Sequence, residues 1–199
     1  MKINNNIVIR KLSLEEARKI YEEHMVRHFP KDEIKPWKSI ERMWNMEAYH
    51  ALGMFEMANR MQPALLGYAL FAQKPEGNVC LLDYFAMLEE CRGQGLGGTF
   101  LGKMKEVLTD YQGILFETED EDAAEDEQQL QVRKRRNAFY EREGMLRTDI
   151  RTEVYGVKYM IWNYPFKGLG TDREACRKNL ADIYRIMIPG EKFGKYVRI

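Results

Sequence analysis

A glycine-rich segment offers the clearest chemistry in this sequence. Residues 92–98 read R-G-Q-G-L-G-G, with four glycines in the six positions after the arginine. Glycine lets the backbone approach a ligand closely and adopt positive φ. If the segment opens a helix, the first amide N–H groups lack intrahelical partners and suit a phosphate or pyrophosphate. We therefore expect an anion site, rather than only a tight turn, made by Arg92, Gly93, Gln94, Gly95, Leu96, Gly97 and Gly98.

The elements around this segment must position it. Residues 79–88 form a strand whose two alternating sets are both mostly apolar, so we expect cover on both of its faces. A helix is expected from about 98 to 111. Strands at 48–56 and 64–73 come before, while a strand at 114–117, a helix at 126–142 and a hairpin around Gly156 follow. This order predicts an α+β fold with a mixed, mostly antiparallel sheet and helices on both faces.

Two cofactors compete for the glycine segment. Gly93, Gly95 and Gly98 satisfy G-x-G-x-x-G, and Glu117 or Glu119 follows about 20 residues later, as in NAD(P)-binding proteins. A dinucleotide fold, however, usually opens with this motif and continues with parallel strand–helix repeats. Here a long antiparallel section precedes the motif. The dinucleotide interpretation is therefore the alternative.

The other interpretation rests on two motifs. Arg92-x-x-Gly95-x-Gly97 matches R/Q-x-x-G-x-G/A, and residues 136–145, RNAFYEREGM, match R-x-x-x-FYE-x-x-GF. With both in this order, residues 7–163 resemble the GNAT superfamily of acetyl-CoA-dependent N-acetyltransferases. The resemblance implies a GNAT-type acyl-CoA N-acyltransferase fold. It also implies transfer of an acetyl group from acetyl-CoA to a primary amine, by direct attack in a ternary complex. A CoA-binding module without catalysis is a further alternative.

The resemblance assigns roles to residues on the cofactor side. The loop amides, chiefly those of Gln94, Gly95, Gly97 and Gly98, would hold the CoA pyrophosphate. The backbone of the preceding strand would pair with the pantetheine arm, and one of its N–H groups would polarise the thioester carbonyl. The matching strand residues are Phe85, Ala86 and Met87.

The later helix would supply two further groups. Asn137 would hydrogen-bond the pantetheine, and Tyr140 would donate a proton to the departing thiolate. A tyrosine hydroxyl is protonated at pH 7 and is a suitable acid. The alternative is that Tyr140 is a core aromatic. Val132 and Phe139 lie on a neighbouring stripe that we expect in the core.

The attacking amine must lose a proton, and two carboxylates are candidate bases. Asp83 is the one charged residue inside the central strand, so burial would change its pKa or require a partner. Glu117, at the end of the adjacent strand, is the second candidate. The alternative for Asp83 is a structural hydrogen-bonding role. The resemblance does not decide between them.

Two charged runs surround the start of the later helix. Residues 117–127 hold eight acids, and residues 133–136 are four consecutive bases. A solvated helix start is one interpretation. In the other, the acids gather a cationic amine and some of the bases meet the CoA 3′-phosphate.

The composition of the whole chain limits the classes of partner, cofactor and location. It has 199 residues, with 31 basic and 31 acidic residues, so its total charge gives no argument for nucleic acid or a membrane. Three cysteines without C-x-x-C spacing, and His24 with His28 lacking a third partner, predict no metal site. We expect a cytoplasmic enzyme, monomer or homodimer, acting on a small-molecule or peptide amine. Residues 1–166 would form the catalytic domain and 167–199 an extension packed on it.

Overall fold

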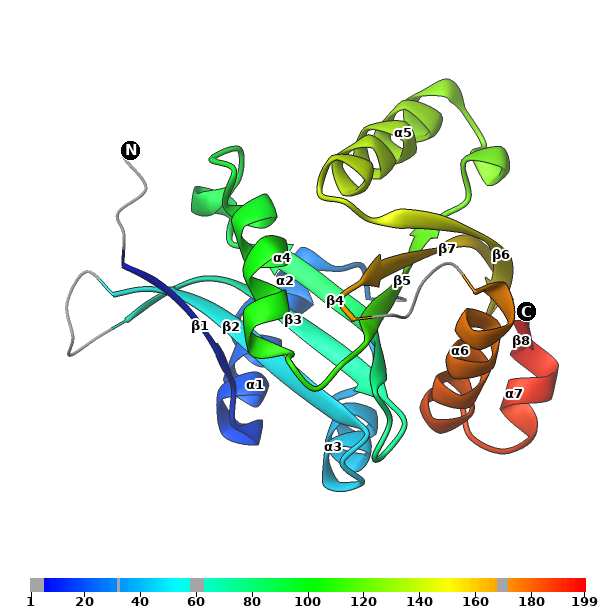
Figure 1. The fold of residues 1–199 in the computed structure, drawn as a ribbon, viewed down its shortest axis with the longest axis horizontal. Coiled ribbons are helices and arrows are strands. Elements are labelled where there is room, and N and C mark those ends of the chain that lie inside the picture. Colours follow the sequence, from blue (N-terminus) through cyan, green and yellow to red (C-terminus); the bar gives the residue numbers. More distant parts are fainter. Residues whose placement is uncertain (1–5, 32, 58–62, 168–171) are drawn as a thin grey trace. The chain divides into compact units, whose positions relative to one another are not determined.

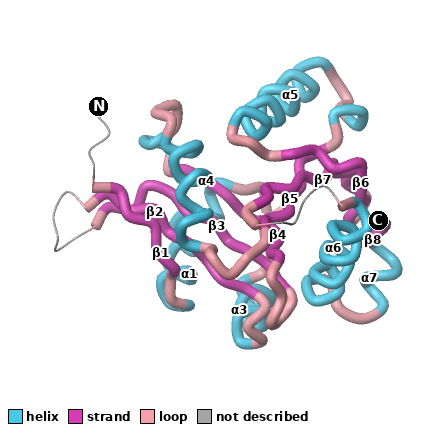
Figure 2. Tube along the Cα trace, in the orientation of Figure 1, coloured by secondary structure: helices cyan, strands magenta, loops and turns pink. Residues whose placement is uncertain are grey.

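The computed structural model describes residues 6–31, 33–57, 63–167 and 172–199. Figure 1 shows the helices and strands, and Figure 2 separates them by colour. The strands are β1 Ile7–Lys11, β2 Tyr49–Glu56, β3 Ala64–Gln73, β4 Val79–Met87, β5 Gly113–Glu119, β6 Leu146–Val154, β7 Val157–Pro165 and β8 Val197–Arg198. The α-helices are α1 Leu14–Ile20, α2 Val26–His28, α3 Trp37–Asn45, α4 Leu96–Val107, α5 Glu127–Arg142, α6 Arg173–Met187 and α7 Glu191–Tyr196.

The strands follow the order β1-β2-β3-β4-β5-β7-β6-β8. β4 and β5 are parallel, with Val79 opposite Gly113 and Leu82 opposite Phe116. The β1–β2, β5–β7, β6–β7 and β6–β8 pairs are antiparallel. The predicted α+β fold with a mixed, mostly antiparallel sheet is therefore confirmed.

The chain divides into two compact units. Unit 1 comprises Met1–Phe71 and Asp83–Thr109, and unit 2 comprises Ala72–Leu82 and Asp110–Ile199. β3 and β4 each contribute residues to both. Of the expected extension, residues 168–171 lie outside the described part, and 172–199 belong to unit 2. The boundary at 166 stays a prediction.

Unit 1 contains the elements that carry the glycine segment. Figure 1 shows α4 on one side of its strands and α1, α2 and α3 on the other. A capping box opens α1, because the Glu16 N–H donates to Ser13 Oγ and the Ser13 N–H donates to a Glu16 oxygen. The helical segment that begins there does not stay regular as far as residue 28. A π-helical turn, Tyr21–Met25, separates α1 from α2.

In unit 2, neighbouring side chains of β5 contact helices on opposite faces of the strand. Phe116, on β5, packs against α5 through Tyr140. The next residue, Glu117, instead meets Tyr184 of α6. Successive side chains of a strand point to opposite faces, so α5 and α6 cover opposite faces of β5. The predicted hairpin turn at Gly156 is confirmed, with Val154 opposite Val157.

Several boundaries and one core assignment differ from expectation. Helix α4 begins at Leu96 rather than 98 and ends at Val107. The last strand of the expected extension is confined to Val197–Arg198, because the short helix α7 takes up the residues before it. The core placement of Val132 is wrong, since its side chain is 40% exposed. Among the described residues, no helix has the length and apolar character to cross a bilayer.

Candidate functional site

The glycine segment has the backbone that the sequence predicted. Gly93 and Gly95 adopt φ of +72° and +75°, the left-handed region that other residues rarely enter. Gly95 is the N-cap of α4, so the loop runs directly into a helix. A Cβ added to either glycine would meet no protein atom within 4 Å. The backbone conformation, rather than crowding by the protein, therefore demands glycine here.

The start of α4 presents backbone donors. Leu96, Gly97 and Gly98 occupy its first turn, where N–H groups have no carbonyl four residues earlier in the helix. The Thr99 N–H is the first to be used, donating to the Gly95 carbonyl at 3.2 Å. Leu96 is buried and anchors the turn, whereas Gly93 and Gly95 are exposed. This arrangement suits an anion.

Two side chains tie the loop to the strand and turn before it. Arg92 Nε donates to the Met87 carbonyl at 3.1 Å, and Gln94 Nε2 donates to the Glu90 carbonyl at 2.7 Å. The Arg92 side chain is otherwise exposed, which leaves its charge beside the loop. Within unit 1 the structure thus joins the loop to Met87, the last of the three strand residues expected to guide the arm.

Asp83 is held by two donors in unit 1. Lys35 Nζ lies 2.7 Å from one carboxylate oxygen, and the Tyr49 hydroxyl donates to the other at 2.5 Å. The Asp83 side chain is only 6% exposed. Burial, followed by the nearby Asp83 charge, raises the pKa of Tyr49 well above 10, so the phenol stays protonated. This geometry matches the structural alternative for Asp83.

Tyr140 lies on α5 in unit 2, against aromatic rings. Its ring centroid is 4.7 Å from that of Phe116 and 6.3 Å from that of Trp162. Burial raises the pKa of Tyr140 above 10. Among the residues that the structure describes, its hydroxyl has no hydrogen-bond partner. The side chain therefore combines the packing of a core aromatic with a protonated hydroxyl that no described group uses.

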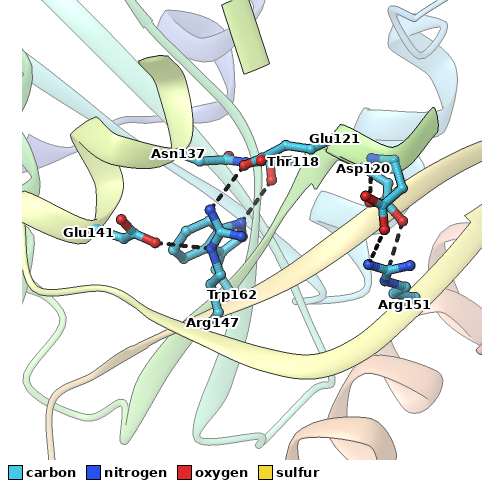
Figure 3. Close-up of polar contacts among 9 residues, drawn as sticks. Thr118, Asp120, Glu121, Asn137, Glu141, Arg147, Arg151 and Trp162 are labelled. Atoms are coloured by element: carbon cyan, nitrogen blue, oxygen red, sulfur yellow. Dashed lines mark hydrogen bonds and ion pairs between the residues drawn. The ribbon is translucent and has the colours of Figure 1, made fainter. Parts of the chain in front are cut away.

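Asn137, three residues earlier on α5, is the one fully buried residue of that helix. Its Nδ2 donates to Glu121 Oε1 at 2.5 Å (Figure 3). Its Oδ1 is buried and has no partner within the described part of the chain. A buried carbonyl without a donor costs about 1–3 kcal/mol, so this atom is suited to accept from a ligand N–H.

Glu117 receives a hydrogen bond that the sequence did not reveal. The hydroxyl of Tyr184, on α6, donates to a Glu117 oxygen, and Thr152 Oγ1 lies 3.4 Å from the same hydroxyl. Burial and the Glu117 charge raise the pKa of Tyr184 well above 10. In the sequence, Tyr184 is simply one more residue on the apolar stripe of α6, so only the fold could bring it to Glu117.

The four acids at residues 119–122 pair with arginines, whereas Glu125, Asp126 and Glu127 are exposed at the start of α5, as expected for a solvated helix start. Glu119 lies 2.9 Å from Arg133, and Arg151 lies 3.4 Å from Asp120 and 2.6 Å from Asp122. Arg133 is only 11% exposed and also donates to the Asp120 carbonyl. These contacts favour neither a free amine-gathering surface nor an Arg133 that meets a 3′-phosphate.

The remaining candidates have packing roles. His28 Nδ1 lies 2.8 Å from the Tyr68 hydroxyl, and the two rings are stacked. No group of three metal-ligating side chains occurs in the described ranges. Cys80, Cys91 and Cys176 are free and buried, and burial raises the pKa of each thiol. Cys91, although it lies next to the loop, is therefore not an activated thiol.

Comparison with known proteins gives independent evidence on the family and the fold. A family model described as the acetyltransferase (GNAT) family matches residues 14–144. A GNAT-family protein from Bacteroides thetaiotaomicron is 18% identical, with a TM-score of 0.68 over 89% of this chain and 97% of that one. The comparison with curated proteins found no match.

Two further solved structures have defined activities. The ribosomal-protein-S18-alanine N-acetyltransferase from Escherichia coli is 15% identical, with a TM-score of 0.57 over 83% of this chain and 97% of that one. Spermidine N-acetyltransferase from Vibrio cholerae, in complex with CoA and spermine, is 13% identical, with a TM-score of 0.53 over 82% and 97%. At these identities the likeness concerns the fold alone. The predicted GNAT-type fold is confirmed, and the dinucleotide alternative is not favoured.

Proposed function

Since the chain belongs to the GNAT acetyltransferase family, we propose that it transfers an acetyl group from acetyl-CoA to a primary amine. The observation that carries this proposal is the glycine loop at the start of α4. Two glycines with positive φ, three first-turn N–H groups and the exposed Arg92 side chain form an anion site beside β4. The CoA pyrophosphate is the anion that we assign to it.

Two observations support the fit to CoA. A Cβ placed on Gly93 or Gly95 would meet no atom beyond the neighbouring residues within 4 Å, so a ligand can approach the backbone from that side. The buried Asn137 Oδ1 needs a donor, and the pantetheine arm carries amide N–H groups. The Vibrio cholerae enzyme, solved with CoA, is a similarly folded example. Phe85, Ala86 and Met87 would guide the arm along β4.

Acetyl-CoA would supply the acetyl group as a thioester. In a ternary complex the amine nitrogen forms the new C–N bond while the C–S bond breaks. Tyr140 would give its hydroxyl proton to the departing sulfur, and its raised pKa keeps that proton in place at neutral pH. The aromatic packing against Phe116 and Trp162 fixes the direction of the ring.

For the base we favour Glu117 over Asp83. Both Asp83 oxygens are occupied by donors, one of them the Lys35 ammonium group. Glu117 is held through Tyr184, a neutral phenol that orients the carboxylate without adding a positive charge. The expected acceptor is a small-molecule or peptide amine. The free thiols support a reducing, cytoplasmic location.

Calorimetry and turnover test the proposal. Wild-type protein titrated with acetyl-CoA, CoA and NADH should release heat with the first two alone; heat with NADH and none with CoA would contradict it. Thiol release should then appear with at least one member of a panel of small amines and peptides. Tight CoA binding without turnover on a broad panel would favour a module without catalysis.

Matched amide variants test whether Glu117 or Asp83 is the general base. Glu117→Gln should lower kcat by about 100-fold, the usual range for a general base. Asp83→Asn should mainly lower the midpoint of thermal unfolding, because it weakens the contact with Lys35. A folded Asp83→Asn variant with the larger loss of kcat would reverse the assignment.

A further inference from the structure

A network of charged side chains surrounds the amide of Asn137. Glu121, in a short 3₁₀ turn after β5, accepts from Asn137 Nδ2 at 2.5 Å and from Arg147 Nη2 at 2.9 Å, both through Oε1. Arg147, on β6, also donates through Nε to Glu141 Oε1 at 3.0 Å. Figure 3 shows these side chains converging from the 3₁₀ turn, α5 and β6.

A buried tryptophan supports the arginine of this network. The Arg147 guanidinium group lies 5.0 Å from the centroid of the Trp162 ring, a cation–π arrangement. Trp162 is completely buried, and its Nε1 donates to Thr118 Oγ1 at 2.8 Å. Arg147 therefore packs on the Trp162 ring and pairs with two carboxylates, and although 43% of its side chain is exposed, it orients Glu121.

This arrangement decides which way the Asn137 amide faces. If the amide were reversed, Oδ1 would lie against Glu121 Oε1, and two acceptors would meet without a proton between them. The nitrogen must therefore point to Glu121. Oδ1 is left as a fixed acceptor without a protein partner in the described ranges. The other residues of α5 are exposed or half-buried, so Asn137 is the residue that this helix commits to the interior.

We propose that Glu121, supported by Arg147, is a positioning residue that fixes the Asn137 amide so that Oδ1 accepts a hydrogen bond from the pantetheine arm of CoA. This inference rests on the proposed function. It adds a requirement that neither motif contains, because residues 121 and 147 both lie outside the R-x-x-G-x-G and FYE segments. Neither residue needs to touch the ligand.

The test compares CoA with 3′,5′-ADP, which keeps the nucleotide but lacks both the pantetheine and the phosphate that joins it. The binding of each ligand is therefore compared between variant and wild type. In Glu121→Ala, calorimetry should show CoA binding about tenfold weaker, the effect of one hydrogen bond, and 3′,5′-ADP binding within twofold of wild type. Asp122→Ala is the matched control. It removes the neighbouring carboxylate of the same turn, which pairs with Arg151 instead, and should leave both affinities unchanged.

A second pair of variants covers the case in which Glu121→Ala fails to fold. Asn137→Asp places two carboxylates together and should weaken CoA binding at least tenfold. Glu121→Gln is the conservative control, because its amide oxygen can still accept from both Asn137 Nδ2 and Arg147 Nη2, and its CoA affinity should stay within about threefold of wild type. A folded Asn137→Asp variant that binds CoA as wild type does would overturn the inference.

The outcomes also separate the inference from the proposed function. Wild-type protein that binds neither ligand contradicts both. Wild-type protein that binds CoA, with Glu121→Ala binding CoA equally well, overturns the positioning role alone. An equal loss of CoA and 3′,5′-ADP affinity in Glu121→Ala would also overturn it, because the effect would not be specific to the arm.

Discussion

The loop before α4 and the inner face of α5 are built in opposite ways. The loop offers backbone N–H groups, and its shape depends on Gly93 and Gly95 in the left-handed region. Helix α5 offers side-chain atoms, the Asn137 amide and the Tyr140 hydroxyl, held by a charged network and by aromatic rings. A backbone site should be sensitive to added bulk. A side-chain site should be sensitive to the loss of single atoms.

The largest effect should come from bulk in the loop. Gly97→Val adds a branched side chain to the first turn of α4, where the pyrophosphate would approach the N–H groups. Losing two such hydrogen bonds, at about 1.5 kcal/mol or more each, should weaken CoA binding by at least about 100-fold in calorimetry. Gly102→Val, at an exposed position of the same helix with no protein atom near the added Cβ, is the control. Equal CoA affinity in the two variants would remove the loop from the site.

Loss of the Tyr140 hydroxyl on α5 should have an effect almost as large, on kcat rather than on binding. Tyr140→Phe keeps the ring against Phe116 and removes the hydroxyl. We expect kcat to fall about 100-fold, as for loss of a general acid, with CoA affinity unchanged. Because burial raises the pKa of Tyr140, the protonated acid persists through the neutral range, and its loss should limit wild-type kcat only above pH 10. A wild-type alkaline limb near pH 8 that persists in the variant would point to a different group.

A smaller effect is expected from the C-terminal helix. Tyr184→Phe removes the donor to Glu117 and should lower kcat by about tenfold without changing CoA affinity, since a hydrogen bond to a charged group contributes about 1.5 kcal/mol or more. Tyr111→Phe removes a different tyrosine hydroxyl of unit 2, one that donates to Gln73, and should leave kcat unchanged. If both variants lose kcat equally, the effect is a general loss of packing.

The smallest effect should come from the exposed arginine of the loop. Arg92→Gln removes a charge but keeps a polar side chain. An exposed charge contributes up to about 1 kcal/mol, so CoA affinity should fall by about threefold to fivefold at low salt. The difference between variant and wild type should shrink as salt is raised, because the charge is screened. A loss that is large and independent of salt would mean that Arg92 also shapes the loop through its contact with Met87.

The features that could be predicted from the sequence are those that depend on residues close together along the chain. Glycine spacing, the Ser13–Glu16 capping box and the helix end before Gly144 are local signals, and the structure agrees with them. The groups that orient Asn137 and Glu117 are not local. Glu121 precedes Asn137 by 16 residues, and Tyr184 follows Glu117 by 67. Residues 117–127 contain eight acids, and no sequence pattern distinguishes Glu121 as the one that accepts a hydrogen bond from the Asn137 amide.

Apolar periodicity also failed where the buried residue is polar. Val132 belongs to the stripe expected to face the core, yet α5 buries the amide of Asn137 and leaves Val132 exposed. Hydrophobic patterning assumes that burial tracks apolar character. A helix that contributes a polar group to a buried site breaks that assumption.

The burial of Cys80, Cys91 and Cys176 has a practical consequence. Cys91, the most exposed of the three, has 7% of its surface accessible, and burial raises the pKa of every thiol in the chain. Attack on a disulfide dye requires a reachable thiolate. Native protein should thus give almost no colour of its own, and the dye can stay in the cuvette throughout turnover as a continuous readout of liberated CoA. A slow rise in the absence of both acceptor and acetyl-CoA would then signal unfolding.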